Sequence, residues 1–156
     1  MSATSPEARL AELGITVPEV VPPVAAYQPS ARTGSLVFTA GQLPARDGEM
    51  IAVGKVGGEV TAEQGYDCAR QCALNALAAI KAEVGSLDEV VRVVKAVVFV
   101  ASTPDFTGQP GVANGASELL GEVFGDAGKH ARSAVGVPVL PLDVPVEVEL
   151  VVEVRA

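Results

Sequence analysis

The segment VEVELVVEV, residues 146–154, constrains the fold most strongly because apolar and acidic side chains alternate along it. A period of two is typical of a β-strand whose successive side chains point to opposite faces of a sheet. One face then carries only Val and Leu at its even positions, and the other carries Glu147, Glu149 and Glu153. The chain must therefore form a sheet covered on one face, and the acidic face is either solvated or directed at a ligand.

The core of this chain must be assembled from small aliphatic side chains. Apolar residues make up 49% of the 156 residues, but aromatic residues make up only 4% and Trp is absent. Val, Ala and Leu suit strands covered by helices with small faces. The length fits one domain and no linker interrupts the pattern, so we expect a single domain over residues 1–156.

Local signals predict the order of the elements. Residues 1–26 form an N-terminal extension with a short helix, for which Ser5 is the N-cap and Gly14 the stop. Thr61 and Gln64 have the spacing of a capping box. The periodicity predicts main helices over 61–85 and 114–124 and strands over 35–44, 93–100, 134–139 and 146–154. The fold class is therefore α+β, with two main helices packed on one face of the sheet.

Charge and cysteine spacing exclude several kinds of function. The net charge of −8 and the absence of a basic cluster disfavour binding to nucleic acid. Cys68 and Cys72 have neither a redox nor a zinc-site spacing, so we expect buried free thiols and no metal. No secretory signal or membrane-spanning run is present in the sequence, and we expect a soluble, cytoplasmic protein with no membrane partner.

The last two predicted strands place Arg132 and Glu147 far apart. If they form a hairpin with Val139 opposite Val146, Arg132 faces Glu153, and Arg132 and Glu147 are roughly 20 Å apart at about 3.4 Å per residue. A site that uses both side chains then needs two subunits.

Three motifs together resemble one known family. They are TAGQLP at 39–44, VFVASTPDF at 98–106, and ARSAVGVPVLP at 131–141 followed by VEVE. In combination they resemble the Rid family, the YjgF-like proteins once called L-PSP endoribonucleases. The resemblance implies a chorismate mutase-like fold with a mixed sheet, a homotrimer with clefts between subunits, and a small carboxylated metabolite as partner. It also implies hydrolytic deamination of reactive 2-imino and 2-enamino acids to 2-oxo acids and ammonia, without cofactor or metal.

The resemblance also implies roles for individual residues. Arg132 matches the arginine that binds the substrate carboxylate, and Glu147 matches the glutamate that positions water. A planar guanidinium suits the first role and a carboxylate that can take a proton suits the second. Residues that match or line the family's substrate cleft are Tyr27, Ala40, Gly41, Phe106, Asn114 and Ala134.

Departures from the family pattern keep alternatives open. Ala40 stands where the well-known deaminases have serine, Ala134 where they have cysteine, and His130 where the motif has proline. A protein that binds or senses a small carboxylate without turnover is therefore an alternative. An endoribonuclease is disfavoured because the chain has one His and no basic stripe. His130 could assist anion binding beside Arg132 or lie at the surface, and Lys55 could contact an anionic ligand or be a solvated loop cation.

Overall fold

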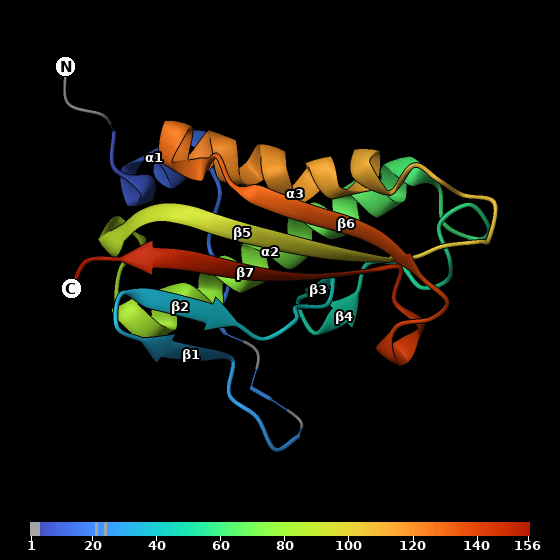
Figure 1. The fold of residues 1–156 in the computed structure, drawn as a ribbon, viewed down its shortest axis with the longest axis horizontal. Coiled ribbons are helices and arrows are strands. Elements are labelled where there is room, and N and C mark those ends of the chain that lie inside the picture. Colours follow the sequence, from blue (N-terminus) through green and yellow to red (C-terminus); the bar gives the residue numbers. More distant parts are fainter. Residues whose placement is uncertain (1–3, 21, 24) are drawn as a thin grey trace.

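The computed structural model describes residues 4–20, 22–23 and 25–156 (Figure 1). The predicted extension over residues 1–26 thus lies partly outside the described residues. Helices and strands follow the chain in the order α1 Pro6–Leu13, β1 Ser30–Thr33, β2 Leu36–Thr39, β3 Ala45–Arg46, β4 Glu49–Met50, α2 Ala62–Val84, β5 Val90–Ala101, α3 Gln109–Phe124, β6 Ala131–Val137 and β7 Val146–Val154. Single 3-10 turns occupy Leu87–Glu89, Gly125–Gly128 and Pro141–Asp143.

The main sheet has five strands in the spatial order β1, β2, β7, β5 and β6. All neighbours are antiparallel except β5 and β6, which run parallel and are connected through α3. The α+β class and the mixed sheet are therefore confirmed. Along β7, every even-numbered side chain from Val146 to Val154 is buried and every odd-numbered one is partly exposed, which confirms the alternation.

Helix α2 covers the apolar face of the sheet, as the ribbon in Figure 1 shows behind β5 and β7. Its capping box is present: the Thr61 N–H donates to Gln64 Oε1 at 2.8 Å, and the Gln64 N–H donates to Thr61 Oγ1 at 3.1 Å. Helix α3 packs closely on α2 at Gly115, where an added Cβ would lie 2.0 Å from the Tyr66 carbonyl oxygen. Small residues thus let the two helix backbones approach each other above a core of Val, Leu and Ala.

The predicted hairpin between the last two strands is wrong. Strand β6 pairs with β5, with Ala96 opposite Arg132, and β7 pairs with β5 on its other side. β5 is the longest strand and is rich in Val, so it gains most by having a partner on both edges. The connection from β6 to β7 passes the end of β5 through the turn at Pro141–Asp143, where Leu142 and Asp143 have positive φ angles of 58° and 57°.

Several boundaries differ from the sequence prediction. The strands predicted over 35–44, 93–100 and 134–139 cover Leu36–Thr39, Val90–Ala101 and Ala131–Val137. Helix α3 begins at Gln109 instead of Asn114, because Pro110 is tolerated in a first helical turn and Gln109 Nε2 donates to the Phe106 carbonyl at 2.8 Å. Strand β1 was not predicted. It is an exposed edge strand without alternating burial, and it pairs with β2 across a turn at Gly34.

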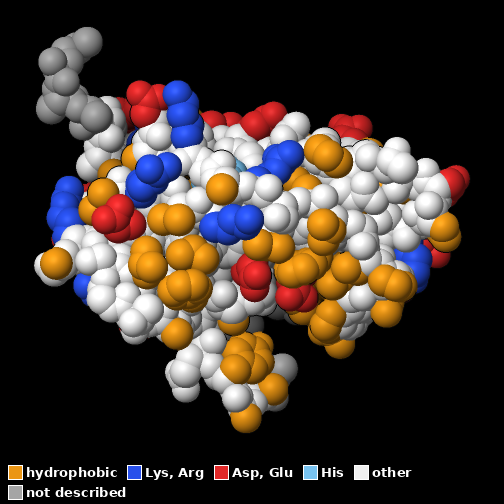
Figure 2. All heavy atoms as spheres, in the orientation of Figure 1, with side chains coloured by type: hydrophobic (Ala, Val, Ile, Leu, Met, Phe, Trp, Pro, Cys, Tyr) orange, Lys and Arg blue, Asp and Glu red, His pale blue; other side chains and the backbone are white. Residues whose placement is uncertain are grey.

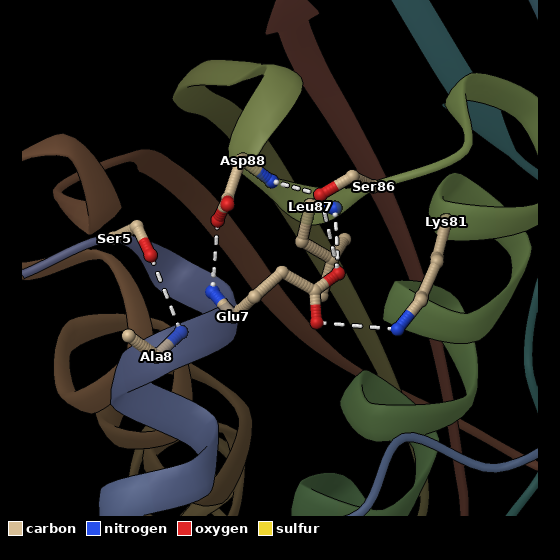
Figure 3. Close-up of polar contacts among 7 residues, drawn as sticks. All are labelled: Ser5, Glu7, Ala8, Lys81, Ser86, Leu87 and Asp88. Atoms are coloured by element: carbon tan, nitrogen blue, oxygen red, sulfur yellow. Dashed lines mark hydrogen bonds and ion pairs between the residues drawn. The ribbon is translucent and has the colours of Figure 1, made fainter.

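The N-terminal helix is attached to the junction between α2 and β5 by one carboxylate (Figure 3). Glu7 accepts hydrogen bonds from the Leu87 N–H at 2.9 Å and from Lys81 Nζ at 3.1 Å, and it lies 3.5 Å from Ser86 Oγ. In return, Asp88 Oδ1 accepts from the Glu7 N–H at 2.9 Å, near the start of α1. These reciprocal contacts fix the short helix, which buries only Leu10.

The second face of the sheet is incompletely covered. Figure 2 looks onto it and shows hydrophobic side chains with acidic and basic ones among them. Phe38 is 42% exposed and Val135 is 44% exposed, and both register with this face. We call the side chains of Phe38, Phe99, Val135, Glu147 and Val151 the open face.

None of the helices in the described ranges combines the length and the apolar character needed to cross a bilayer.

Candidate functional site

Arg132 is held against α3 at the edge of the sheet. It shares the helix-covered side with its register partner Ala96, which is fully buried. Nη1 donates to Asn114 Oδ1 at 2.8 Å and to Ser117 Oγ at 3.1 Å, and Nη2 lies 3.4 Å from the Pro110 carbonyl oxygen. Both hydrogens of Nη1 and one hydrogen of Nη2 are thus engaged, which leaves the Nε hydrogen and the second Nη2 hydrogen for a ligand.

A row of hydrogen bonds extends from Arg132 to His130. His130 Nε2 lies 2.9 Å from Ser117 Oγ, and His130 Nδ1 lies 2.6 Å from the Gly128 carbonyl oxygen. These residues line a hollow of about 340 Å³. The structure therefore places His130 beside Arg132 through Ser117. Sequence reasoning missed Ser117, although its i, i+3 spacing from Asn114 places both on one side of a helix.

Glu147 lies on the opposite face of the sheet, in contact with Gly41. A Cβ at position 41 would lie 2.0 Å from Glu147 Oε2, so the carboxylate occupies space that only glycine leaves free. Partial burial raises the pKa of Glu147 above its usual value, and the neighbouring Glu149 charge raises it further. A carboxyl group in this setting suits proton transfer closer to neutral pH.

Tyr27 and Gly41 line the same small cavity, of about 160 Å³. Tyr27 is 48% exposed at its mouth, and Leu142, 71% exposed, lies on its rim. Leu142 was not expected there, and its positive φ gives no sequence signal. Ala40 holds this segment through its backbone: its N–H donates to the Pro29 carbonyl at 2.8 Å and its carbonyl accepts from Gln42 Nε2 at 3.1 Å.

The other predicted residues lie elsewhere. Phe106 lines a different hollow, of about 340 Å³, together with Gly136 and Pro138. Ala134 is partly buried and packs on the core. Lys55 forms an ion pair with Asp143 at 3.7 Å, in the turn that carries Leu142.

Within one chain, Arg132 and Glu147 cannot act together. Arg132 pairs with Ala96 on one edge of β5, and Glu147 pairs with Phe99 on the other edge. Ala96 and Phe99 are three positions apart along β5. Strand geometry puts the two Cα atoms roughly 14 Å apart, less than the predicted hairpin required, but their side chains point to opposite faces. The structure therefore brings together Arg132 with Asn114, and separately Glu147 with Gly41, which also lines the Tyr27 cavity.

Cys68 and Cys72 are buried free thiols, as predicted. Burial raises the pKa of Cys72 well above its usual value. The described part of the chain contains no group of three or more His, Cys, Asp or Glu side chains placed to hold a metal ion.

Comparison with known proteins agrees with the fold and the motifs. Residues 7–154 match the family described as "YjgF/chorismate mutase-like, putative endoribonuclease". Protein TCP17 of Trypanosoma cruzi is 44% identical over 95% of this chain and 93% of its own length. The RutC family protein PH0854 of Pyrococcus horikoshii is 30% identical over 83% of this chain and 87% of its own.

Solved structures give the same result. The protein Atu1372 of Agrobacterium tumefaciens, described as of unknown function, superposes with a TM-score of 0.89 at 40% identity, covering 97% of this chain and 93% of its own. TdcF of E. coli with bound serine gives a TM-score of 0.64 at 27% identity, covering 88% and 94%. The chain belongs to the YjgF/chorismate mutase-like family.

Proposed function

We propose that this protein is a homotrimeric deaminase that hydrolyses reactive 2-imino and 2-enamino acids to 2-oxo acids and ammonia, without cofactor. The observation that carries the proposal is the placement of Arg132 and Glu147 on opposite faces of one sheet. A carboxylate clamp and a proton acceptor that cannot meet within a chain can meet across an interface between chains. The exposed apolar side chains around Glu147 on the open face supply a surface for such an interface.

Arg132 is prepared to bind a carboxylate in one orientation. Asn114 and Ser117 engage Nη1, so a substrate carboxylate accepts two parallel hydrogen bonds from Nε and Nη2. Contacts from α3 hold the guanidinium before the ligand arrives, which reduces the entropy lost on binding. The substrate carbon next to the carboxylate is then fixed relative to the sheet edge.

Glu147 of the neighbouring subunit supplies the proton transfers. Its carboxylate accepts a proton from water as the water oxygen bonds to the iminium carbon, which gives a carbinolamine. The same proton then passes to the amine nitrogen. As the C–N bond breaks, Glu147 takes the proton of the carbinolamine hydroxyl, which gives the 2-oxo acid and ammonia, and this proton leaves with ammonia as ammonium. Water, the iminium ion and the products balance without an oxidant or reductant, and an iminium carbon is already electrophilic, so positioning provides much of the catalysis.

The relatives support a small carboxylated ligand. TdcF of E. coli is described with bound serine, a molecule that carries a carboxylate. Other relatives are described as endoribonucleases, such as a structure from Shewanella oneidensis. The net charge of −8 and the single His of this chain give no support to phosphate binding or to acid–base cleavage of RNA.

A second candidate is a protein that binds small carboxylates without turnover. Ala40 and Ala134 favour it, because neither side chain offers a hydrogen bond to a reacting group. Both candidates need Arg132 for affinity, but only the deaminase needs Glu147 for rate.

The deciding experiment generates 2-iminobutyrate or 2-aminoacrylate in situ and follows its decay with purified protein. Arg132→Ala and Glu147→Gln should each lower kcat/KM about 100-fold or more. Arg92→Ala and Glu153→Gln are matched controls, since both residues lie on the same sheet, and they should retain activity. If wild type leaves the decay unchanged while the 2-oxo acid binds through Arg132, the binding protein is correct. Faster decay that neither variant affects contradicts the assigned site.

A further inference from the structure

A larger hollow lies outside both sets of residues described above. It has a volume of about 510 Å³ and is bounded by α2, by the segment that follows α1, and by residues around the β3–β4 hairpin. None of its lining residues belongs to the Arg132 row or to the Tyr27 cavity. We call it the α2 groove.

The floor of the α2 groove combines apolar side chains with one amide oxygen that has no partner among the described residues. Ile15, Ile51, Leu74 and Leu119 contribute the apolar part. Gln71 is only 8% exposed, and its Nε2 donates to Asn75 Oδ1 at 3.1 Å, whereas its carboxamide oxygen pairs with no described residue and is not enclosed by the protein. This oxygen, on a largely buried side chain that lines the groove, can accept a hydrogen bond from a ligand there.

Two oppositely charged, exposed side chains line the groove. Arg46 and Asp67 both line it, and neither side chain forms a hydrogen bond or ion pair with another described residue. Burial, with a smaller contribution from the Asp67 charge and an opposing one from the Arg46 charge, raises the pKa of the Cys68 thiol to about 11. Both charges therefore act on one thiol in the wall of the groove.

We propose that the α2 groove binds a zwitterionic α-amino acid with an aliphatic side chain. Its carboxylate bonds to Arg46, its ammonium group donates to Asp67 and to the Gln71 oxygen, and its side chain lies on the apolar floor. A ligand with only one of the two charges leaves one of these partners unsatisfied. The inference is independent of the deaminase activity, because it uses no residue of that site.

The test is calorimetric titration of the full chain with L-leucine as the probe. Saturable binding is expected, and 4-methylpentanoate and 3-methylbutylamine, which each lack one charge, should bind about tenfold more weakly or not at all. Arg46→Gln and Asp67→Asn should each weaken leucine binding about tenfold, since each removes a charge-assisted hydrogen bond. Glu63→Gln is the matched control, because Glu63 is an exposed acid on α2 outside the groove.

A further variant shows whether leucine binds in the α2 groove or in the hollow that Arg132 lines. Arg132→Ala should bind leucine as tightly as wild type if the groove is the site. The proposal is overturned if leucine gives no saturable heat, if Arg46→Gln and Asp67→Asn bind it as wild type does, or if Arg132→Ala abolishes binding.

Discussion

Gly41 determines where the Glu147 carboxylate can lie. Its φ is not in the left-handed region, so alanine fits the backbone, but a Cβ would occupy the position of Oε2. The requirement for glycine comes from a neighbouring side chain and not from the turn. A substitution at position 41 therefore displaces the carboxylate of Glu147, the proposed base.

Gly41→Ala should lower kcat about tenfold or more while the protein stays folded, because the carboxylate must move away from the attacking water. Steady-state kinetics and a thermal melt measure the two effects. Adding Glu147→Asp shortens the acid and removes the overlap, so the double variant should recover part of the lost rate relative to Gly41→Ala. An unchanged kcat in Gly41→Ala would show that this contact does not position the base.

The raised pKa of Glu147 predicts a pH effect with a definite sign. The general base acts when unprotonated, so kcat/KM should fall as pH falls through its pKa, which lies above the usual value near 4.3. Glu149→Gln removes the neighbouring charge that contributes to the increase, so the acid limb of the pH–rate profile should move to lower pH. If the acid limb of the profile has the same apparent pKa in this variant as in wild type, the ionising group is not Glu147.

At the scale of elements, two glycines of α3 differ in their surroundings: Gly115 packs on α2, and Gly121 does not. Gly115→Ala should destabilise the fold by about 1–3 kcal/mol, because its Cβ meets the Tyr66 backbone. Gly121→Ala has open space around its Cβ and should stabilise by about 0.5–1 kcal/mol through helix propensity. Urea unfolding of both variants measures the difference, and equal effects would contradict the close helix contact.

The sequence predicted the elements whose signals are local. The alternation of β7 and the capping box of α2 depend on neighbouring residues, and both are confirmed. The partner of β6 is decided by how α3 and β5 pack, which no short pattern encodes, and so the predicted hairpin failed. Likewise, the contact between Arg132 and Ser117 depends on α3 lying along β6. The motifs pointed to the residues of the candidate site but not to which of them meet.

For the whole molecule, the open face predicts an assembly. Sedimentation equilibrium of wild type should give about three times the 15.8 kDa mass of one chain. Val135→Lys puts a charge among the exposed apolar side chains of this face and should yield a folded monomer without deaminase activity, although Arg132 and Glu147 are intact. Val139→Lys is the control, since Val139 is exposed beyond the end of β6. A fully active monomer of wild type or of Val135→Lys would contradict a site shared between subunits.

Ser117 lies between Arg132 and His130, and its hydroxyl group has one hydrogen to donate. Because Ser117 accepts from the guanidinium, its own hydrogen is free to point at His130 Nε2, and the neutral imidazole then carries its hydrogen on Nδ1, toward the Gly128 carbonyl. The ring nitrogens of His130, the one histidine in the chain, therefore report on the state of the arginine. A nitrogen-15 spectrum of this tautomer would therefore register occupancy of the hollow that Arg132 and His130 line.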